Sequence, residues 1–238
     1  SKWANIRHRK GAQDQKRGKI FTKIIKEITI SARLGGADLN ANPRLRKAVS
    51  NAKAKNMPSD KIERAIKKGT GELEGVIYEE VTYEGYGPHG VAIIINVITD
   101  NKNRSVADIR HILSKYNGNL GENGSVSWMF EKKGHIIIES DAIEENIIFE
   151  AIIDAGAEDF QVLDDIYLII TMPELLLKIR DSLESKKFVI KSAEIEMVPK
   201  SLQKLNNREV DSVINLLEAL DDNDDVNKLY SNFDYVEN

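Results

Sequence analysis

The chain contains 238 residues, of which 41% are hydrophobic and 30% are charged, as in an ordinary globular protein of one to three domains. Cysteine is absent, which excludes a disulfide framework, a thiolate metal site and a cysteine nucleophile. No apolar run approaches the ~20 residues that span a bilayer, and no signal-peptide core is visible. We therefore expect a cytoplasmic protein, or one of the mitochondrial matrix if residues preceding Ser1 formed a transit peptide.

The net charge of -4 conceals a strong asymmetry along the chain. Residues 1–75 hold 19 basic and 7 acidic side chains, a net charge of +12, whereas the other 163 residues hold 15 basic and 31 acidic, a net charge of -16. A distribution of this kind is typical of a protein with one face for a polyanion, although lysine-rich helix faces also occur on proteins that bind no nucleic acid. The clustering of the positive charge favours the interpretation that this part of the chain binds a polyanion.

Residues 1–12 form a short basic segment that contains Trp3 and His8. The segment is too short to hold a core of its own, so we expect Trp3 to dock on the helices that follow rather than to stack on a base. His8 has no partner at metal-ligand spacing and is expected to be solvated.

Three amphipathic helices are predicted next. The first, over residues 16–34, has apolar residues at i, i+3, i+4 and i+7 and an opposite face that is almost purely cationic, and Gly35-Gly36 ends it. Asn42-Pro43 supplies the N-cap and first residue of the second helix, which residues 56–58 break. The third covers about 58–68. Small apolar residues on these helices predict a compact three-helix unit.

The pattern changes to β-type after an acidic, glycine-rich link. A first segment reads strand, strand, helix, strand over residues 76–86, 91–99, 106–117 and 125–131. A second segment has the order βαββαβ, the split-βαβ or ferredoxin-like arrangement, over residues 135–139, 142–155, 159–163, 166–171, 173–183 and 188–198. One more helix and strand follow at 210–220 and 226–235.

The terminal helix and strand have too few partners to stand alone, and the first β-type segment lacks just such a pair. We therefore predict an α+β protein in three parts. These are a basic helical domain (1–75), a discontinuous α+β domain (76–132 plus 207–238), and a ferredoxin-like domain inserted into it (133–206).

No catalytic constellation stands out in the sequence. The four histidines are scattered, GxxxxGK[ST] is absent, and GYGPHG precedes a strand rather than opening a helix. Residues 100–103 begin like a calcium loop but lack its later glycine and glutamate, so we expect Asp100 or Asn103 to cap a helix instead. The acidic run 221–225 is expected to be a solvated turn. We predict a non-enzymatic protein without a metal or cofactor.

Nucleic acid is the better candidate ligand. Lys and Arg spread along helix faces suit phosphate contacts, which give affinity without sequence information. The helices lack a base-reading cluster at an N-terminus, and the ferredoxin-like segment lacks the aromatic set that binds RNA. The predicted contact residues are Lys2, Arg7, Arg9, Lys10, Lys16, Arg17, Lys19, Lys23, Lys26, Arg33, Arg44, Arg46, Lys47, Lys53 and Lys55.

Several motifs resemble those of the YebC family. The helical part carries SKWANIRHRK, DQKRGKIFTKIIKEI, GGAD, NPRLRKAVSNAKAKNMP and IERAIKKGTG, and the next part carries YEGYGP, GVAIIIN and the NLG–GSV–W-F run. The resemblance is dense over residues 1–131 and continues beyond them as domain order. His89 is a departure, because the family usually has glycine there.

The resemblance implies a helical N-terminal domain, two α+β domains and a role in gene expression. Family members are described as DNA-binding transcriptional regulators, whereas mitochondrial relatives resemble translational activators and bacterial ones have been linked to stalled ribosomes. We therefore expect a monomeric, non-membrane regulator that binds DNA, or alternatively ribosomal or transfer RNA on the ribosome. A small-ligand sensor is a further alternative, for which the sequence offers no pocket residues.

Overall fold

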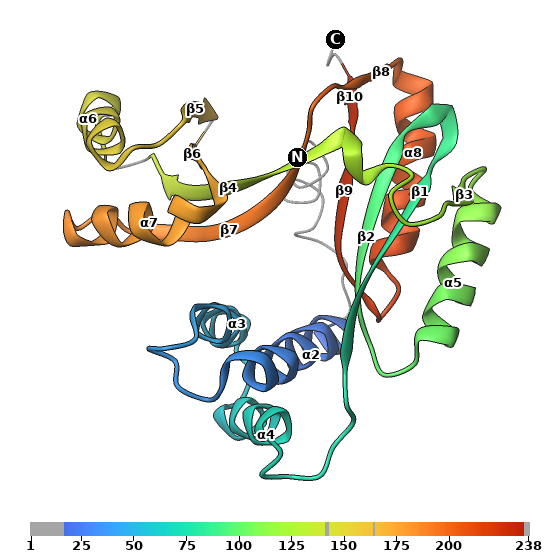
Figure 1. Cartoon of the computed structure of the whole chain (residues 1–238), viewed down its shortest axis with the longest axis horizontal. Helices are drawn as coiled ribbons and strands as arrows, with labels where there is room; N and C mark the ends of the chain where they lie inside the picture. Colours follow the sequence, from blue (N-terminus) through green and yellow to red (C-terminus); the bar gives the residue numbers. More distant parts are fainter. Residues whose placement is uncertain (1–16, 141–142, 164, 236–238) are drawn as a thin grey trace. The chain divides into compact units, whose positions relative to one another are not determined.

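The computed structural model describes residues 17–140, 143–163 and 165–235, which fall into two compact units. One unit comprises the chain up to 128 together with the chain from 201 onward, and the other comprises 129–200. The fold is α+β, as predicted, with N-terminal helices followed by antiparallel sheets and their covering helices (Figure 1). Among the described residues, no helix is both long and apolar enough to cross a membrane.

The N-terminal helices are α2 (Arg17–Gly35), α3 (Pro43–Ala54) and α4 (Ser59–Thr70). Asn42 caps α3 as predicted, since its Oδ1 accepts a hydrogen bond from the Leu45 N–H at 3.1 Å. The Asn42 amide also donates to the Ser31 and Gly36 carbonyls, which ties the start of α3 to the end of α2. The core between the helices contains Ile24, Ile28, Ala32, Leu45, Ala48, Val49, Ala52, Met57, Ile62 and Ala65.

The remainder of this unit is built on a four-stranded antiparallel sheet of order β3-β1-β2-β9. Helices α5 and α8 cover one face of it, where they pack on alternate residues of the central strand β2 (Figure 1). The elements are β1 (Glu79–Tyr86), β2 (Ala92–Thr99), α5 (Lys102–Lys115), β3 (Asn119–Leu120), α8 (Asn207–Asp221) and β9 (Val226–Ser231). Two short strands, β8 (Gln203–Leu205) and β10 (Phe233–Tyr235), pair in parallel beside it.

The 129–200 unit has the predicted element order βαββαβ, and its strands form an antiparallel sheet of order β5-β6-β4-β7. Its core lies between this sheet and the two helices. The elements are β4 (Phe130–Glu139), α6 (Glu145–Ala155), β5 (Asp159–Leu163), β6 (Ile166–Thr171), α7 (Leu176–Ser185) and β7 (Ile190–Pro199).

The predicted strand over 125–131 is wrong. Residues 127–129 form a 3-10 turn, and β4 then covers residues 130–139, because β7 pairs with it from Phe130 to Ile138. The loop before β4 is held by Glu84, whose buried carboxylate accepts hydrogen bonds from the N–H groups of Gly124, Val126 and Ser127. Those bonds satisfy backbone groups that a strand would have paired elsewhere.

The predicted cap of α5 is also wrong. Asn101, rather than Asp100 or Asn103, accepts the Arg104 N–H at 3.0 Å, while the Asp100 carboxylate binds the Arg104 guanidinium at 2.7 Å. The predicted terminal strand is interrupted at Asn232, where the side chain accepts the Ala92 N–H.

His89 occupies a left-handed backbone conformation with φ of 60°. That region costs a residue other than glycine about 1–2 kcal/mol, which explains why glycine suits this position. The His89 ring compensates by contacting α8, with Nε2 3.0 Å from the Ser212 Oγ. The His89 side chain therefore fastens the loop to helix α8.

Candidate nucleic-acid interface

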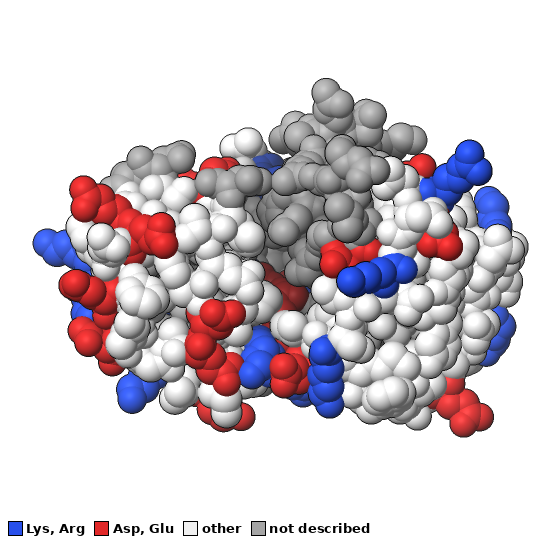
Figure 2. All heavy atoms as spheres, turned by 90° about the horizontal axis from the view of Figure 1, so that it is seen from above, with Lys and Arg blue, Asp and Glu red and all other residues white. Residues whose placement is uncertain are grey.

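The Lys and Arg side chains are distributed unevenly over the surface of the described residues. On the face shown in Figure 2, Lys and Arg are scattered among Asp and Glu and form no continuous basic area in the part of the chain that the structure describes. The basic N-terminal helices therefore have to be considered one face at a time.

The lysines of α2 form ion pairs within the protein. Lys19, Lys23 and Lys26 are spaced i, i+4 and i+7, and all three contact the acidic turn at residues 221–225, which follows α8. Lys19 Nζ lies 2.8 Å from the Asp222 carboxylate, and the Lys23 amine donates to a backbone carbonyl at the start of the turn. Their positive charge meets carboxylates of the same chain, so this part of the predicted contact surface faces the protein itself.

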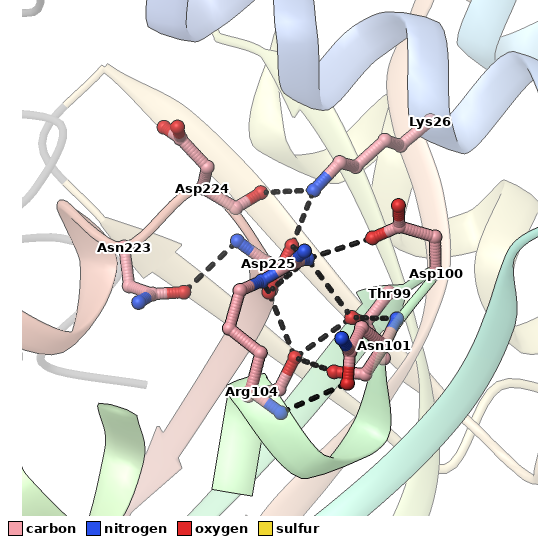
Figure 3. Close-up of polar contacts among 9 residues, drawn as sticks. Lys26, Thr99, Asp100, Asn101, Arg104, Asn223, Asp224 and Asp225 are labelled. Carbon is pink, nitrogen blue, oxygen red and sulfur yellow. Dashed lines mark hydrogen bonds and ion pairs between the residues drawn. The ribbon is translucent and has the colours of Figure 1, made fainter. Parts of the chain in front are cut away.

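Asp225 is the centre of this contact (Figure 3). Its carboxylate lies 2.6 Å from Lys26 Nζ, accepts the Ser105 hydroxyl at 2.7 Å and binds Arg104 Nη2 at 3.0 Å. The Asp225 and Lys26 side chains are only 5% and 9% exposed. The prediction that Lys26 faces a nucleic acid is therefore wrong, because Lys26 and Asp225 are each the partner that makes the burial of the other tolerable. The prediction of a solvated turn at 221–225 is wrong for the buried Asp221 and Asp225, whereas Asp222 and Asp224 are exposed.

The surroundings of Asp225 favour its ionised form. Burial by itself raises the pKa of a carboxyl, but hydrogen bonds from Lys26, Ser105 and Arg104 outweigh it and lower the pKa of Asp225 below its ordinary value of 3.8. The Asp225 carboxylate is therefore ionised at neutral pH.

Three further predicted contacts, all arginines, have intramolecular partners. Arg44 at the start of α3 binds Glu27 at 2.7 Å and Glu80 at 3.0 Å. Arg33 donates to a backbone carbonyl of the segment before β1, and Arg46 donates to one before α3. A recognition helix reads bases with side chains at its N-terminus. The arginine at the start of α3 is already committed to carboxylates.

Lys47, Lys53 and Lys55 of the predicted set are exposed. They lie in a stretch, residues 42–58, that contains five basic residues and no acidic one. The outward stripe of α3 includes the exposed polar residues Ser50 and Asn51. We call Lys47, Ser50, Asn51, Lys53 and Lys55 the α3 surface.

Helix α4 adds exposed cations that the predicted list omitted, namely Lys61, Arg64, Lys67 and Lys68. The signal was present in the sequence, since IERAIKKG places basic residues on the polar side of an apolar stripe. Exposed Asp60 and Glu63 reduce the net charge of this helix.

Part of the predicted set cannot be placed. Lys2, Arg7, Arg9, Lys10 and Lys16 lie outside the described residues, and Arg17 is the first residue of α2. Across the described ranges, no group of three or more His, Cys, Asp or Glu is arranged to hold a metal ion.

Two sequence profiles together cover almost the whole chain. The profile for the TACO1/YebC protein N-terminal domain matches residues 1–72, and the profile for the TACO1/YebC second and third domain matches residues 78–233. The chain belongs to the TACO1/YebC family. The resemblance predicted from the motifs is thereby confirmed.

Bacterial members of the TACO1/YebC family share about half of their residues with this chain. A protein of Desulfosudis oleivorans is 55% identical over 232 residues, and one of Geobacter sulfurreducens is 53% identical over 234 residues. In both comparisons the match covers 98% of this chain and 94% of the relative. Both relatives carry the name probable transcriptional regulatory protein.

A crystal structure of a conserved hypothetical protein from Aquifex aeolicus shares the fold. It is 45% identical to this chain and superimposes with a TM-score of 0.89, covering 100% of this chain and 98% of the other. The α+β architecture is thus also found in that solved structure.

Proposed function

We propose that this TACO1/YebC protein is a nucleic-acid-binding regulator of gene expression and that the α3 surface is its principal contact with phosphates. One observation carries the proposal: the three lysines of the α3 surface are exposed, and residues 42–58, in which they lie, contain no Asp or Glu. The names of the bacterial relatives support a regulatory role, with DNA as the first target.

The chemistry of the α3 surface suits a phosphate backbone. Three ammonium groups can each neutralise a phosphate, and the Ser50 hydroxyl and Asn51 amide can donate hydrogen bonds to phosphate oxygens. Because Arg44 is held by Glu27 and Glu80, the surface offers backbone contacts rather than base-edge contacts. We therefore infer affinity that depends strongly on salt and weakly on sequence.

The test compares two triple variants of the full chain with equal changes in charge. One replaces Lys47, Lys53 and Lys55 by Gln, and the control replaces Lys178, Lys187 and Lys200, which are exposed in the 129–200 unit. Binding to a labelled mixed-sequence DNA duplex is measured by fluorescence anisotropy over a salt titration. We expect roughly a tenfold or larger loss for the first variant and a slope of log affinity against log salt that is shallower by about 3, with little change for the control.

The same titration is repeated with a labelled RNA hairpin to decide which polyanion is preferred. Tighter binding of the hairpin, lost in the α3 variant, would move the function from transcription to RNA. Equal losses in the two triple variants would contradict the assignment of the α3 surface, because only the total charge would then matter.

A further inference from the structure

One edge of the 129–200 unit exposes a contiguous group of apolar side chains. Phe149 and Ile153, one turn apart on α6, are 46% and 59% exposed, and Val162 on β5 is 49% exposed. Phe160 lies on the same face of β5 as Val162, and its ring centroid is 6.0 Å from that of Phe149. Single exposed apolar residues are ordinary, but a contiguous group marks a place of interaction. We call these four residues the edge patch.

The edge patch adjoins an open strand. β5 is the outermost strand of its sheet, and within the described residues it pairs only with β6. The other side of such a strand presents N–H and C=O groups to which an extended peptide can add. Apolar side chains beside an open strand edge are the two components of a peptide site that works by strand addition.

The acidic residues around the edge patch favour a positively charged binding partner. Residues 139–165 contain ten Asp and Glu and no Lys or Arg. Glu150 follows Phe149 directly, and Asp154, which lies 3.6 Å from Lys186, follows Ile153. Asp159 begins β5 and Asp165 lies two residues after its end, and all four carboxylates are exposed. Pairing of two β5 strands from two copies of the chain would bring like charges together, and a nucleic acid would be repelled. A cationic segment would be attracted.

We propose that the edge patch binds an extended, cationic and apolar segment of a partner protein as an added strand on β5. Residues alternate between the two faces of a strand, so alternate apolar side chains of the segment lie over Phe160 and Val162. The intervening basic side chains lie on the side of Asp159. The site is separate from the α3 surface and does not depend on the function proposed for it.

The first experiment uses the full chain and a labelled peptide of alternating lysine and valine. Two controls are a lysine–serine peptide of the same charge and a lysine–valine peptide N-methylated at alternate residues, which removes the N–H donors of one edge. We expect the unmodified lysine–valine peptide to bind about tenfold or more tightly than either control, a difference equivalent to about 1.4 kcal/mol. Equal binding of the lysine–serine peptide would show that only charge attraction holds the peptide and would contradict a role for the apolar side chains. Unchanged binding after N-methylation would exclude strand addition.

The second experiment localises the site with charge substitutions at exposed positions. Ile153→Lys and Val162→Lys each place a positive charge in the edge patch, and Val189→Lys is the matched control, since Val189 is 81% exposed next to the opposite edge strand, β7. We expect roughly tenfold weaker binding of the lysine–valine peptide in the first two variants and no change in the third. Similar effects in all three, or none in any, would overturn the proposal.

Discussion

Helices α2 and α3 carry the same kind of cationic face and put it to different uses. The lysines of α2 are spaced like those of a helix that binds a polyanion, yet Lys26 is buried against Asp225 and Lys19 and Lys23 reach the same acidic turn. Lys47 and Lys53 of α3, and Lys55 directly after it, are spaced i, i+6 and i+8 and are exposed. The spacing of charged residues along a helix therefore shows that one face of the helix is polar. Which group that face contacts depends on the segments of the chain that fold against it.

The charged side chains of α2 have a structural role. Its contact with the acidic turn joins residues 199 positions apart and links the N-terminal helices to the β3-β1-β2-β9 sheet within one unit. The exposed cations of α3 and α4 can contact other molecules. The variants below separate these two uses.

The largest expected effect comes from breaking the buried pair. Asp225→Asn leaves the Lys26 ammonium without its counter-charge, and we expect the free energy of unfolding to fall by about 3–5 kcal/mol, measured by chemical denaturation. Asp224→Asn is the matched control, because the Asp224 side chain is exposed and only its backbone carbonyl accepts Lys26. Similar losses in both variants would show that the total charge of the turn matters, and not the buried pair.

The next effect is a separation of stability from binding. The triple variant of the α3 lysines should lose about 1.4–2.7 kcal/mol of nucleic-acid affinity, corresponding to tenfold to a hundredfold, and keep its unfolding free energy within about 0.5 kcal/mol. Lys23→Gln in α2 should show the opposite pattern, with lower stability and unchanged affinity. A loss of affinity in the α2 variant at constant stability would remove the distinction between the two faces.

The buried pair also has a pH signature. Because hydrogen bonds lower the pKa of Asp225 below 3.8, the stability it contributes is fully present above the pKa of the unfolded carboxyl and is lost as the pH falls through the lower folded value. The difference in thermal midpoint between the wild-type chain and Asp225→Asn should therefore be constant from pH 7 to about 5 and shrink below about 4. A difference that stays constant down to pH 3 would mean that the carboxylate charge is not what stabilises the contact.

The smallest effect is expected at the exposed end of the same contact. The Lys19 and Asp222 side chains are 39% and 70% exposed, so Lys19→Gln should cost less than about 1 kcal/mol of unfolding free energy. Added salt should erase that difference in denaturation curves while leaving the larger effect of Asp225→Asn mostly intact. Comparable salt sensitivity of the two variants would indicate that Lys26 is as well solvated as Lys19.

Much of the secondary structure could be predicted because its signals are local. Asn42-Pro43 supplies its own cap, and the β-branched run of β2 is buried in the centre of the sheet, as such runs usually are. The path of β4 could not be predicted, because the polar residues before Gly134 look like a loop until β7 pairs with them. The choice of Asn101 over its neighbours as cap depended on backbone geometry, which three polar residues in a row do not reveal.

The sequence by itself determined the family, the α+β class and the concentration of positive charge in the N-terminal helices, because motifs, periodicity and composition are properties of neighbouring residues. Only the tertiary structure decided which of those charges remain exposed. A lysine is attracted to any carboxylate within reach, and whether one is within reach depends on where the fold places a turn some 199 residues away. In this protein that turn forms ion pairs with the lysines of α2, whereas the residues of the α3 surface are exposed.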